Sequence, residues 1–562
     1  MKKAIPVIIA IVLIGVVVAL NFGNALYAKY SYGTERADLN EYFDKYYEDS
    51  VPIILQDEKI ADFAKIIEGE LYLEKEVVEN YLTMDFYFDY NENLFLFTTD
   101  KETVRSEIGS DTYTEGGELK TFECPITVVK EDEMYISMKY IKKFVNYSYE
   151  LFSDPDHIQM YTEWGEKKVA TINDDTAVRW KGGVKSVILT DAVKGDEVEI
   201  LEPMDEWTKV KTKDAYIGYV ENKKLSDERI VEETPVTDVE WNYTSLTKEG
   251  KINMAWHNIE YPMDGYGLIA DCAKIKSVNV ISPTSFWLTD NEGNFKSVLT
   301  ESYVEAAHQM GADVWVLVSN FHYGDDVDLE EVLSYTQKRA YLIQNLVTET
   351  VAKGADGINV DFENVSSSCG PHYVQFIKEL SLACHENNLV ISVDNYVPTE
   401  YTRHYRRSAQ AKFADYLVIM GYDEHYAGSD VGSVGSIPWV KLGIEDTMTV
   451  CPAEKIILGI PFYTRVWMTT GNAVTSEAVD MATSNEFLAK HSLVPTLDEA
   501  TGQNYAEIAF GGTLYQVWME DEYSIKERLN LIDSTGIAGV AEWKLGMETD
   551  EVWDYIESYM LK

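Results

Sequence analysis

The chain has 562 residues, which is long enough for three or four domains, and 46% of them are hydrophobic, so sizeable cores are possible. Its net charge of -47 excludes nucleic acid and an anionic membrane surface as ligands, because both attract basic proteins, but a neutral or cationic polymer stays compatible. Five scattered cysteines without a CxxC pair and nine histidines without an HxxxH pair argue against a disulfide framework and a metal site. We therefore expect neither a metal nor a cofactor.

The N-terminus carries an apolar run of about 17 residues, AIPVIIAIVLIGVVVAL, directly after Lys2 and Lys3. The run is long for the core of a signal peptide and short for a membrane-spanning helix, and no clear cleavage site follows it. We expect residues 1–27 to form an uncleaved membrane anchor, with a cleaved signal peptide as the alternative. The two lysines place the N-terminus in the cytoplasm and the rest of the chain outside.

Residues 28–165 contain an internal repeat. The segments that begin at Glu70 and Glu133 align, with Tyr72 matching Tyr135 and apolar positions recurring after it. Each unit predicts a short strand, a helix and a strand hairpin, whose turns are DYNEN and SDPDH. The region resembles the α+β repeat domain at the N-terminus of copper amine oxidases, but without copper ligands. A spacer or wall-contact role is the preferred interpretation.

Residues 167–226 show short alternating strands separated by Gly and Asp turns, which is typical of a small β-barrel. The sequences VR, KGD and GYV, together with Trp207, resemble the bacterial Src-homology-3-like domain. That resemblance implies binding to cell-wall peptides, with Trp207 either a platform for the ligand or part of the core. The acidic, proline-bearing residues 227–240 are expected to be a linker.

Residues 241–562 alternate apolar β-type runs with helical patterns, and the runs number eight. This alternation predicts a (β/α)8 barrel, in which the chemistry lies at the C-terminal ends of the strands. The runs are INMAW (252–256), VNVIS (278–282), VWVLV (314–318), GINVDFE (357–363), LVISVD (389–394), YLVIMGYD (416–423), IILGIPF (456–462) and IAGVAEW (537–543).

The fourth run places polar side chains on one face of a strand. In DGINVDFE, residues 356–363, a period of two puts Asn359, Asp361 and Glu363 on the face opposite the three apolar residues. If both faces are buried, the two carboxylates cost several kcal/mol unless they share protons or hydrogen bonds. Such a cost favours a functional role. An amphipathic strand with one solvated face is the alternative.

These runs together resemble glycoside hydrolase family 18, the chitinase family, over the whole domain. In its strand-four signature DxxDxDxE, Asp356, Asp361 and Glu363 match, and Asn359 stands where the family usually has a second Asp. The family's later motifs follow in order as MGYD (420–423), LGIPFYTRVW (458–467) and AEWKLG, which contains Trp543. The stretches at 515–529 and 280–288 also resemble the branch that lyses spore cortex and cell wall.

The resemblance implies roles for individual residues. Glu363 would protonate the leaving oxygen, and Asp361 would hold the acetamido N–H of the substrate and stabilise an oxazolinium ring. Tyr422 would donate a hydrogen bond to the acetamido group. The substrate-binding residues would be Asn359, Met420, Asp423, Tyr463, Arg465 and Trp543, with Trp543 stacking under the reacting sugar.

Some of these residues have other readings. Asn359 cannot hold a charge, which removes proton exchange through this position, but it can hydrogen-bond Asp361. Packing at the barrel rim is an alternative for Tyr422, Asp423 and Trp543. Asp356 is out of phase with the inward face and is expected to be a structural cap.

The expected function is an extracytoplasmic glycosidase that cleaves β-1,4 bonds after N-acetylglucosamine, in peptidoglycan, spore cortex or a chitin-like polymer. It would lie in the bacterial cell envelope, anchored at the outer face of the cytoplasmic membrane or secreted. Two alternatives remain: a weak or inactive glycan-binding protein on the same barrel, supported by Asn359, and an adhesin based on the N-terminal repeats.

Overall fold

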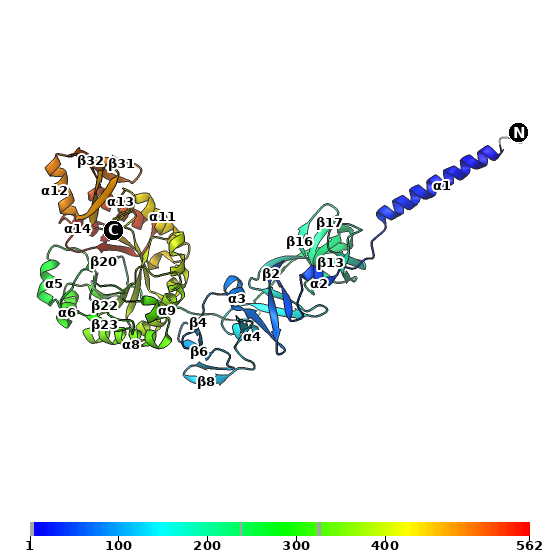
Figure 1. Ribbon diagram of the computed structural model, residues 1–562, viewed down its shortest axis with the longest axis horizontal. Helices are drawn as coiled ribbons and strands as arrows, with labels where there is room; N and C mark the ends of the chain where they lie inside the picture. The colour runs from blue at the N-terminus through cyan, green and yellow to red at the C-terminus, as the bar shows by residue number, and fades with distance from the viewer. Residues whose placement is uncertain (1–4, 236–238, 323–326, 562) are drawn as a thin grey trace. The chain divides into compact units, whose positions relative to one another are not determined.

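The computed structural model describes residues 5–235, 239–322 and 327–561 (Figure 1). They divide into two compact units, which are treated separately. The first unit comprises Met1–Met84, Ser106–Tyr113 and Leu119–Glu240, and the second comprises Asp85–Arg105, Thr114–Glu118 and Trp241–Lys562.

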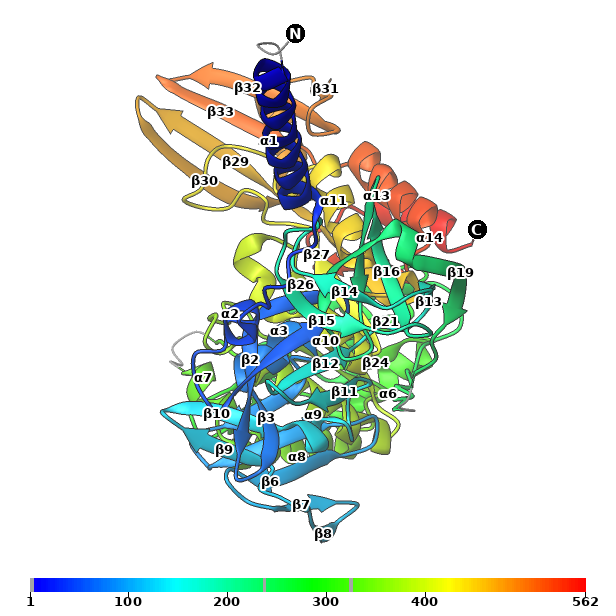
Figure 2. The same cartoon turned by 90° about the vertical axis from the view of Figure 1, so that its right-hand side faces the viewer.

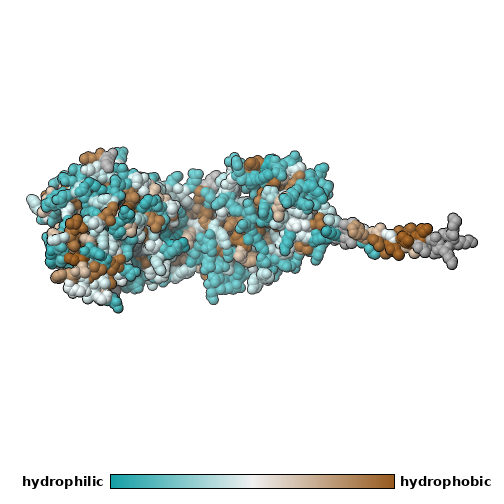
Figure 3. All heavy atoms as spheres, turned by 90° about the horizontal axis from the view of Figure 1, so that it is seen from above, coloured by the Kyte–Doolittle hydropathy of each residue, from teal (hydrophilic) through white to brown (hydrophobic). Residues whose placement is uncertain are grey.

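Helix α1, Ile5–Tyr30, begins the first unit, and Figure 3 shows apolar side chains along it. In the part of the chain that the structure describes, no helix has both the length and the apolar composition needed to cross a membrane. The predicted anchor at 1–27 is therefore not supported. Lys2 and Lys3, on which the predicted orientation depends, lie outside the described residues.

A seven-stranded mixed sheet follows, in the order β11-β12-β1-β2-β3-β10-β9. Both repeats have the predicted succession of strand, helix and hairpin: β3, α3, β4 (Phe86–Asp89) and β5 (Leu94–Thr98) in the first, and β10, α4, β11 and β12 in the second. The strands of this sheet are β1 (Ser50–Leu55), β2 (Glu58–Ile67), β3 (Glu70–Glu74), β9 (Thr127–Lys130), β10 (Glu133–Ser137), β11 (Ser148–Phe152) and β12 (His157–Tyr161). The helices of the same region are α2 (Leu39–Phe43), α3 (Lys75–Tyr81) and α4 (Met138–Ile141).

The last part of the first unit is a seven-stranded antiparallel sheet, in the order β15-β14-β18-β17-β16-β13-β19, around a small aliphatic core. The all-β prediction agrees with this sheet, and the likeness to Src-homology-3-like and amine oxidase domains stays a prediction. The strands are β13 (Glu166–Ile172), β14 (Thr176–Arg179), β15 (Ile188–Ala192), β16 (Glu197–Pro203), β17 (Trp207–Lys211), β18 (Ile217–Glu221) and β19 (Leu225–Glu232), with the short helix η1 (Asn222–Lys224) between the last two.

The predicted linker at 227–240 differs from the structure over its first half. Residues up to Glu232 belong to β19, an edge strand that pairs antiparallel with β13. Its charged side chains form ion pairs, Glu228 with Lys168 and Arg229 with Glu197. An acidic run is thus compatible with an edge strand, since charges protect such an edge from further pairing. Residues 236–238 lie outside the described part of the chain.

The second unit contains a closed barrel of eight parallel strands, which confirms the predicted fold and every predicted strand. The strands pair in the order β21-β20-β34-β28-β27-β26-β25-β24, and pairing of β21 with β24 closes the ring. The strands are β20 (Ile252–His257), β21 (Val280–Pro283), β24 (Asp313–Ser319), β25 (Gly357–Asp361), β26 (Val390–Tyr396), β27 (Tyr416–Met420), β28 (Ile456–Pro461) and β34 (Gly539–Trp543).

Two apolar layers make this unit. The interior of the barrel is filled by the inward residues of its strands, among them Met254, Trp315 and Val418, and the outward residues pack beneath the helices. The surrounding helices are α5 (Gly265–Asp271), α6 (Glu301–Gln309), α7 (Leu329–Leu333), α8 (Thr336–Lys353), α9 (Gly370–Glu386), α10 (Arg407–Phe413), α11 (Ile437–Met448), α13 (Glu522–Thr535) and α14 (Val552–Met560), with short helices η2 (Glu400–Tyr405) and η3 (Ala453–Lys455) and an extra hairpin β22 (Phe286–Leu288) and β23 (Phe295–Ser297).

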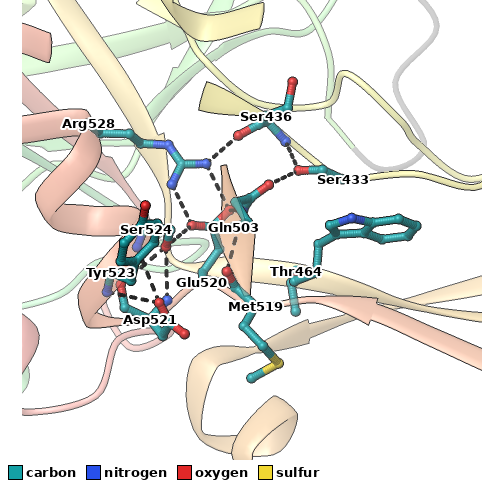
Figure 4. A network of polar contacts seen from close by, with 12 residues as sticks. Ser433, Ser436, Thr464, Gln503, Met519, Glu520, Asp521, Tyr523, Ser524 and Arg528 are labelled. Atoms are coloured by element: carbon teal, nitrogen blue, oxygen red, sulfur yellow. Dashed lines mark hydrogen bonds and ion pairs between the residues drawn. The ribbon is translucent and has the colours of Figure 1, made fainter. Parts of the chain in front are cut away.

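An antiparallel sheet is inserted between β28 and β34 and projects from the barrel (Figure 2). A buried ion pair fixes the base of this insertion: Arg528 donates to both carboxylate oxygens of Glu520, at 2.6 and 2.9 Å, and Gln503 donates to one of them (Figure 4). The inserted elements are β29 (Tyr463–Thr470), β30 (Ala473–Asp480), α12 (Met481–His491), β31 (Thr496–Asp498), β32 (Gln503–Phe510) and β33 (Thr513–Trp518).

The hairpin β4 (Phe86–Asp89) and β5 (Leu94–Thr98) packs on the barrel helices, although the sequence groups it with residues 28–165. The Asp89 carboxylate accepts hydrogen bonds from the backbone N–H and hydroxyl of Thr336, at 2.7 and 2.6 Å. It thereby satisfies a free N–H in the first turn of α8. Strands β6 (Thr103–Glu107), β7 (Thr112–Glu115) and β8 (Glu118–Thr121) complete this five-stranded sheet.

Candidate active site

The polar face of β25 points into the barrel, and its apolar face packs under the helices. Ile358, Val360 and Phe362 belong to the core between strands and helices. Asn359 is completely buried, Asp361 is 7% exposed, and Glu363 is half-buried just beyond the end of the strand. The three polar side chains therefore follow one another from the barrel interior towards its C-terminal mouth.

Asn359 makes four hydrogen bonds to three other strands of the barrel. Its Oδ1 accepts from Trp256 Nε1 and from Ser282 Oγ, both at 3.0 Å. Its Nδ2 donates to Ser392 Oγ at 3.0 Å and to Asp394 Oδ1 at 2.8 Å. These four hydrogen bonds use both N–H donors and both oxygen lone pairs of the amide. The expected bond to Asp361 is absent from the described contacts, and Asp394 on β26 takes its place.

Asp394 brings a third carboxyl group to the site. It is 2% exposed and lines the same cavity as Asp361 and Glu363. Burial raises the pKa of Asp394 to about 8; the hydrogen bond from Asn359 opposes this rise and the charge of Glu363 adds to it. Burial among other acids therefore makes Asp394 a much better proton acceptor than an ordinary aspartate.

Asp361 is buried without a partner for one of its oxygens, Oδ1. Burial, and then the charges of Asp394 and Glu363, raise the pKa of Asp361 well above its ordinary value. Among the described residues no lysine or arginine forms an ion pair with any of these three carboxyl groups. The site therefore favours protons on its carboxyl groups and attracts a hydrogen-bond donor to Asp361.

Glu363 is oriented by hydrogen bonds at both its backbone and its side chain. Asn320 exchanges two hydrogen bonds of 2.9 Å with the Glu363 backbone. The hydroxyl of Tyr396, at the end of β26, donates to Glu363 Oε2 at 2.7 Å. Burial raises the pKa of Glu363 against that hydrogen bond, and the charge of Asp423 raises it further. A half-buried carboxylic acid at the mouth of a cavity is suited to proton donation.

The carboxyl groups face two adjoining cavities. One, of about 130 Å³, is lined by Asp361, Glu363 and Asp394 together with residues of later strands. The other, of about 490 Å³, shares Asp361, Glu363 and Trp543 with it and extends along the ends of β20, β21 and β24. Three further residues of the smaller cavity had been singled out from the sequence: Met420, Tyr422 and Asp423.

Aromatic rings form the floor and wall of the smaller cavity. Trp256 meets Trp543 and Tyr422 edge to face, at centroid distances of 5.8 and 6.4 Å. Burial raises the pKa of Tyr422 well above its ordinary value, so its hydroxyl stays a hydrogen-bond donor. A flat indole face beside carboxyl groups is a surface on which a sugar ring can stack.

Two of the expected substrate-binding residues come from β29 of the insertion. Tyr463, which is 7% exposed, donates from its hydroxyl to Asp423 Oδ1 at 2.6 Å and so orients that carboxylate. Arg465 lies on β29 of the insertion and donates to Ser476 Oγ at 3.2 Å. Neither borders the two cavities.

Asp356 lies outside the barrel interior. Its Oδ2 accepts from the Val314 backbone N–H and from His308 Nε2, both at 2.8 Å. It therefore joins the N-terminal end of β25 to the neighbouring strand and helix. Within 5–235, 239–322 and 327–561, no group of three or more His, Cys, Asp or Glu side chains is arranged to hold a metal ion.

Three residues that line the smaller cavity were not predicted from the sequence: Trp256, Asp394 and Tyr396. A signal for two of them was present. In the run LVISVDNY, residues 389–396, a period of two places Asp394 and Tyr396 on one face, as it does for Asp361 and Glu363 in the run before. Trp256 occupies the same kind of inward position at the end of β20.

The family profile described as "Glycosyl hydrolases family 18" matches residues 216–548, which is more than half of the chain. The "Uncharacterized glycosylase YvbX" of Bacillus subtilis is 27% identical over 255 residues, 43% of this chain and 73% of that protein. The "Cortical fragment-lytic enzyme" of the same organism is 26% identical over 250 residues, 42% of this chain and 57% of that enzyme. The chain therefore spans little more than half of the second relative.

Among solved structures, the spore cortex-lytic enzyme SleL of Bacillus cereus superposes with a TM-score of 0.50 at 21% sequence identity. The superposition covers 55% of this chain and 74% of that one. At this identity the likeness concerns the fold alone.

Proposed function

The chain belongs to the glycosyl hydrolases family 18 and is a glycosidase, and from that premise we propose that it hydrolyses β-1,4 bonds after N-acetylglucosamine with retention of configuration. The nucleophile in this proposal is the 2-acetamido oxygen of the substrate itself. Glu363 protonates the leaving oxygen and afterwards takes a proton from the attacking water.

The observation that carries the proposal is the unpartnered, buried Oδ1 of Asp361 in a cavity that also contains Glu363. An acetamido N–H is a donor of the right kind for that oxygen, and its engagement would turn the acetamido oxygen towards the anomeric carbon. Asp361 and Asp394 are at most 7% exposed, below the half-buried Glu363, so neither is well placed to attack a sugar that rests at the mouth.

Other residues fit the same geometry. Tyr422 has a protonated hydroxyl at the cavity wall and would donate to the acetamido group. Trp543 would stack beneath the reacting sugar, and the larger cavity beyond it has room for further sugar units. Asp423, oriented by Tyr463, would hold the hydroxyl groups of the sugar.

The substrate we favour is wall glycan, peptidoglycan or spore cortex, with chitin-like polymer as the second choice. One observation supports it: the relatives include a cortical fragment-lytic enzyme. Wall glycan lies outside the cytoplasmic membrane, so we place the protein in the extracytoplasmic part of the bacterial envelope.

Purified vegetative peptidoglycan, spore cortex and chitin oligomers, each digested with wild-type protein and analysed by mass spectrometry, test this proposal. We expect new reducing ends on N-acetylglucosamine from at least one polymer. The alternative, a glycan-binding barrel without turnover, predicts retention of protein on the polymer without any released fragment, and that result would overturn the enzymatic proposal.

A further inference from the structure

Asp394 is a buried carboxyl group at the active site, and the proposed mechanism assigns it no role. It comes from β26, the strand next to β25, and the register that pairs Asn359 with Ser392 brings Asp394 beside Asp361 one step further on. Burying a carboxyl group so completely is costly unless its charge is paired or its proton retained. No cation among the described residues pairs with it.

Asn359 determines which oxygen of Asp394 can carry a proton. The indole N–H of Trp256 is only a donor, so the oxygen of the Asn359 amide must face Trp256 and its NH₂ group must face Asp394. Asp394 Oδ1 therefore accepts a hydrogen bond, and Oδ2 is left as the site for a proton. Asn359 itself can neither gain nor lose one.

Within the described part of the chain, the surroundings of Asp394 contain no compensating positive charge. The titratable groups that act on it or feel its charge are Asp361 and Glu363 at the end of β25, Tyr422 after β27 and Tyr373 of α9. Tyr396 of β26 lines the same cavity. All of them are acids. Like-charged carboxyl groups in such a place hold one proton in common rather than ionising together.

We propose that Asp394 is the proton acceptor for Asp361 during the reaction, in place of the carboxylate that Asn359 lacks. This proposal rests on the proposed function. In the free protein the proton lies on Asp361, whose Oδ1 has no donor, and the charge lies on Asp394, which receives the Asn359 hydrogen bond.

When the acetamido N–H of the substrate approaches Asp361, that carboxyl group must become an acceptor. The O–H bond of Asp361 breaks and an O–H bond forms at Asp394 Oδ2, so the pair keeps one proton and one negative charge throughout. Asp361 is then anionic beside the positive oxazolinium ring, and the charge has moved towards the place where the transition state needs it. The proton returns when the product leaves.

The test uses two variants of the full chain. Asp394→Asn keeps the size of the side chain and removes the acceptor. The double variant Asn359→Asp/Asp394→Asn moves the carboxylate back to β25, and it reverses the existing hydrogen bond, since the new amide at 394 can donate to the new carboxylate at 359. Turnover of a GlcNAc oligomer, pH–rate profiles and thermal melting are measured for both variants, the wild type and Asn359→Asp.

We expect Asp394→Asn to melt like the wild type and to lose about a hundredfold or more in kcat, as removal of a proton acceptor does. The alkaline limb of its profile should move to lower pH, because one negative charge near Glu363 and Asp361 is gone. The double variant should recover at least about tenfold of the lost rate. If Asp394→Asn does not fold, the activity of the folded double variant relative to the wild type tests the proposal by itself.

A folded Asp394→Asn within threefold of the wild-type rate would overturn the proposal, as would a folded double variant no faster than the single one. Neither result touches the proposed function, which the wild-type rate tests separately. A wild-type protein without turnover on any of the polymers would overturn both.

Discussion

Two buried groups of carboxylates in the barrel unit behave in opposite ways. Asp85, where the β4–β5 hairpin meets the helices, accepts from Lys378 at 2.9 Å and from Lys412 at 3.0 Å. Burial acts to raise its pKa, but the charges of the two lysines lower it below the ordinary range. Asp361 is also buried, but its neighbours are Asp394 and Glu363, and its pKa is raised.

The difference shows that the sign of the neighbouring charge, more than burial itself, decides what a buried carboxylate can do. A carboxylate paired with lysine is ionised at neutral pH and joins one element to another. A carboxylate among other acids keeps a proton that it can give away. Removing a carboxylate of the first kind should therefore cost stability, and removing one of the second kind should cost activity.

Substrates without a 2-acetamido group should react about 10⁴-fold more slowly or worse, because an intramolecular nucleophile supplies an effective molarity of roughly 10⁵ M or more. Among the residues that the structure describes, the acid cluster around Asp361 has no positive partner, and it is suited to a substrate that becomes positive. Rates on aryl glycosides of glucose and of N-acetylglucosamine oligomers give the comparison.

A thiazoline analogue of the oxazolinium ring should inhibit competitively in the same assay. Equal rates on both sugars, or a covalent sugar adduct on Asp361, would instead place the enzyme among glycosidases with a protein nucleophile.

Replacement Glu363→Gln should lower kcat by 10²–10⁴-fold or more, since the general acid is lost. The fold should persist, because Tyr396 can donate to the amide oxygen as it does to the carboxylate. Thermal melting and product release are measured together. Glu301→Gln, on the exposed first turn of α6, serves as the control that should keep full activity. Activity within tenfold of the wild type in a folded Glu363→Gln protein would contradict the assignment.

Replacement Asp85→Asn should lower stability instead of activity. It should destabilise the barrel unit by about 3 kcal/mol, because it leaves the buried Lys378 ammonium without its carboxylate. Folding lowers the pKa of Asp85, so its stabilisation is present above the ordinary pKa of 3.8 and disappears as the pH falls below it. The gap between wild type and variant in urea unfolding should therefore close in acid.

Activity per folded molecule should not change in Asp85→Asn, in contrast to Glu363→Gln. Asp554→Asn, which breaks an exposed ion pair with Lys276, should leave the unfolding midpoint unchanged. An Asp85 variant as stable as this control would show that the hairpin is joined to the helices by other contacts.

Replacement Asn359→Asp should leave activity within about a hundredfold and move both limbs of the pH–rate profile to higher pH. The added carboxylate faces Asp394, and Asp394 loses the hydrogen bond that Asn359 donates in the wild type. The new negative charge raises the pKa values of the other acids in the cluster. Identical profiles for both proteins would show that position 359 is not electrically coupled to the site.

The sequence allowed much of the barrel to be predicted. All eight strands were located from apolar runs, and the period of two placed Asp361 and Glu363 on the inward face of β25 correctly. Local patterns suffice here because the residues of a parallel strand buried on both faces must be apolar, except where a polar side chain has a function. The β4–β5 hairpin falls in the second compact unit, whereas the sequence groups it with residues 28–165, and its repeat partner β11–β12 pairs in the seven-stranded sheet.

Local patterns were enough to locate the strands of the barrel, the two faces of each strand, and two acids two residues apart on one of them. The closed barrel was needed to show that Asp394 and Tyr396 of the next strand lie beside those acids, and that Trp256 of the first strand contacts Asn359 across the barrel. The physical reason is register: side-chain direction follows from the local backbone, but which residues become neighbours depends on how separate strands align when the barrel closes.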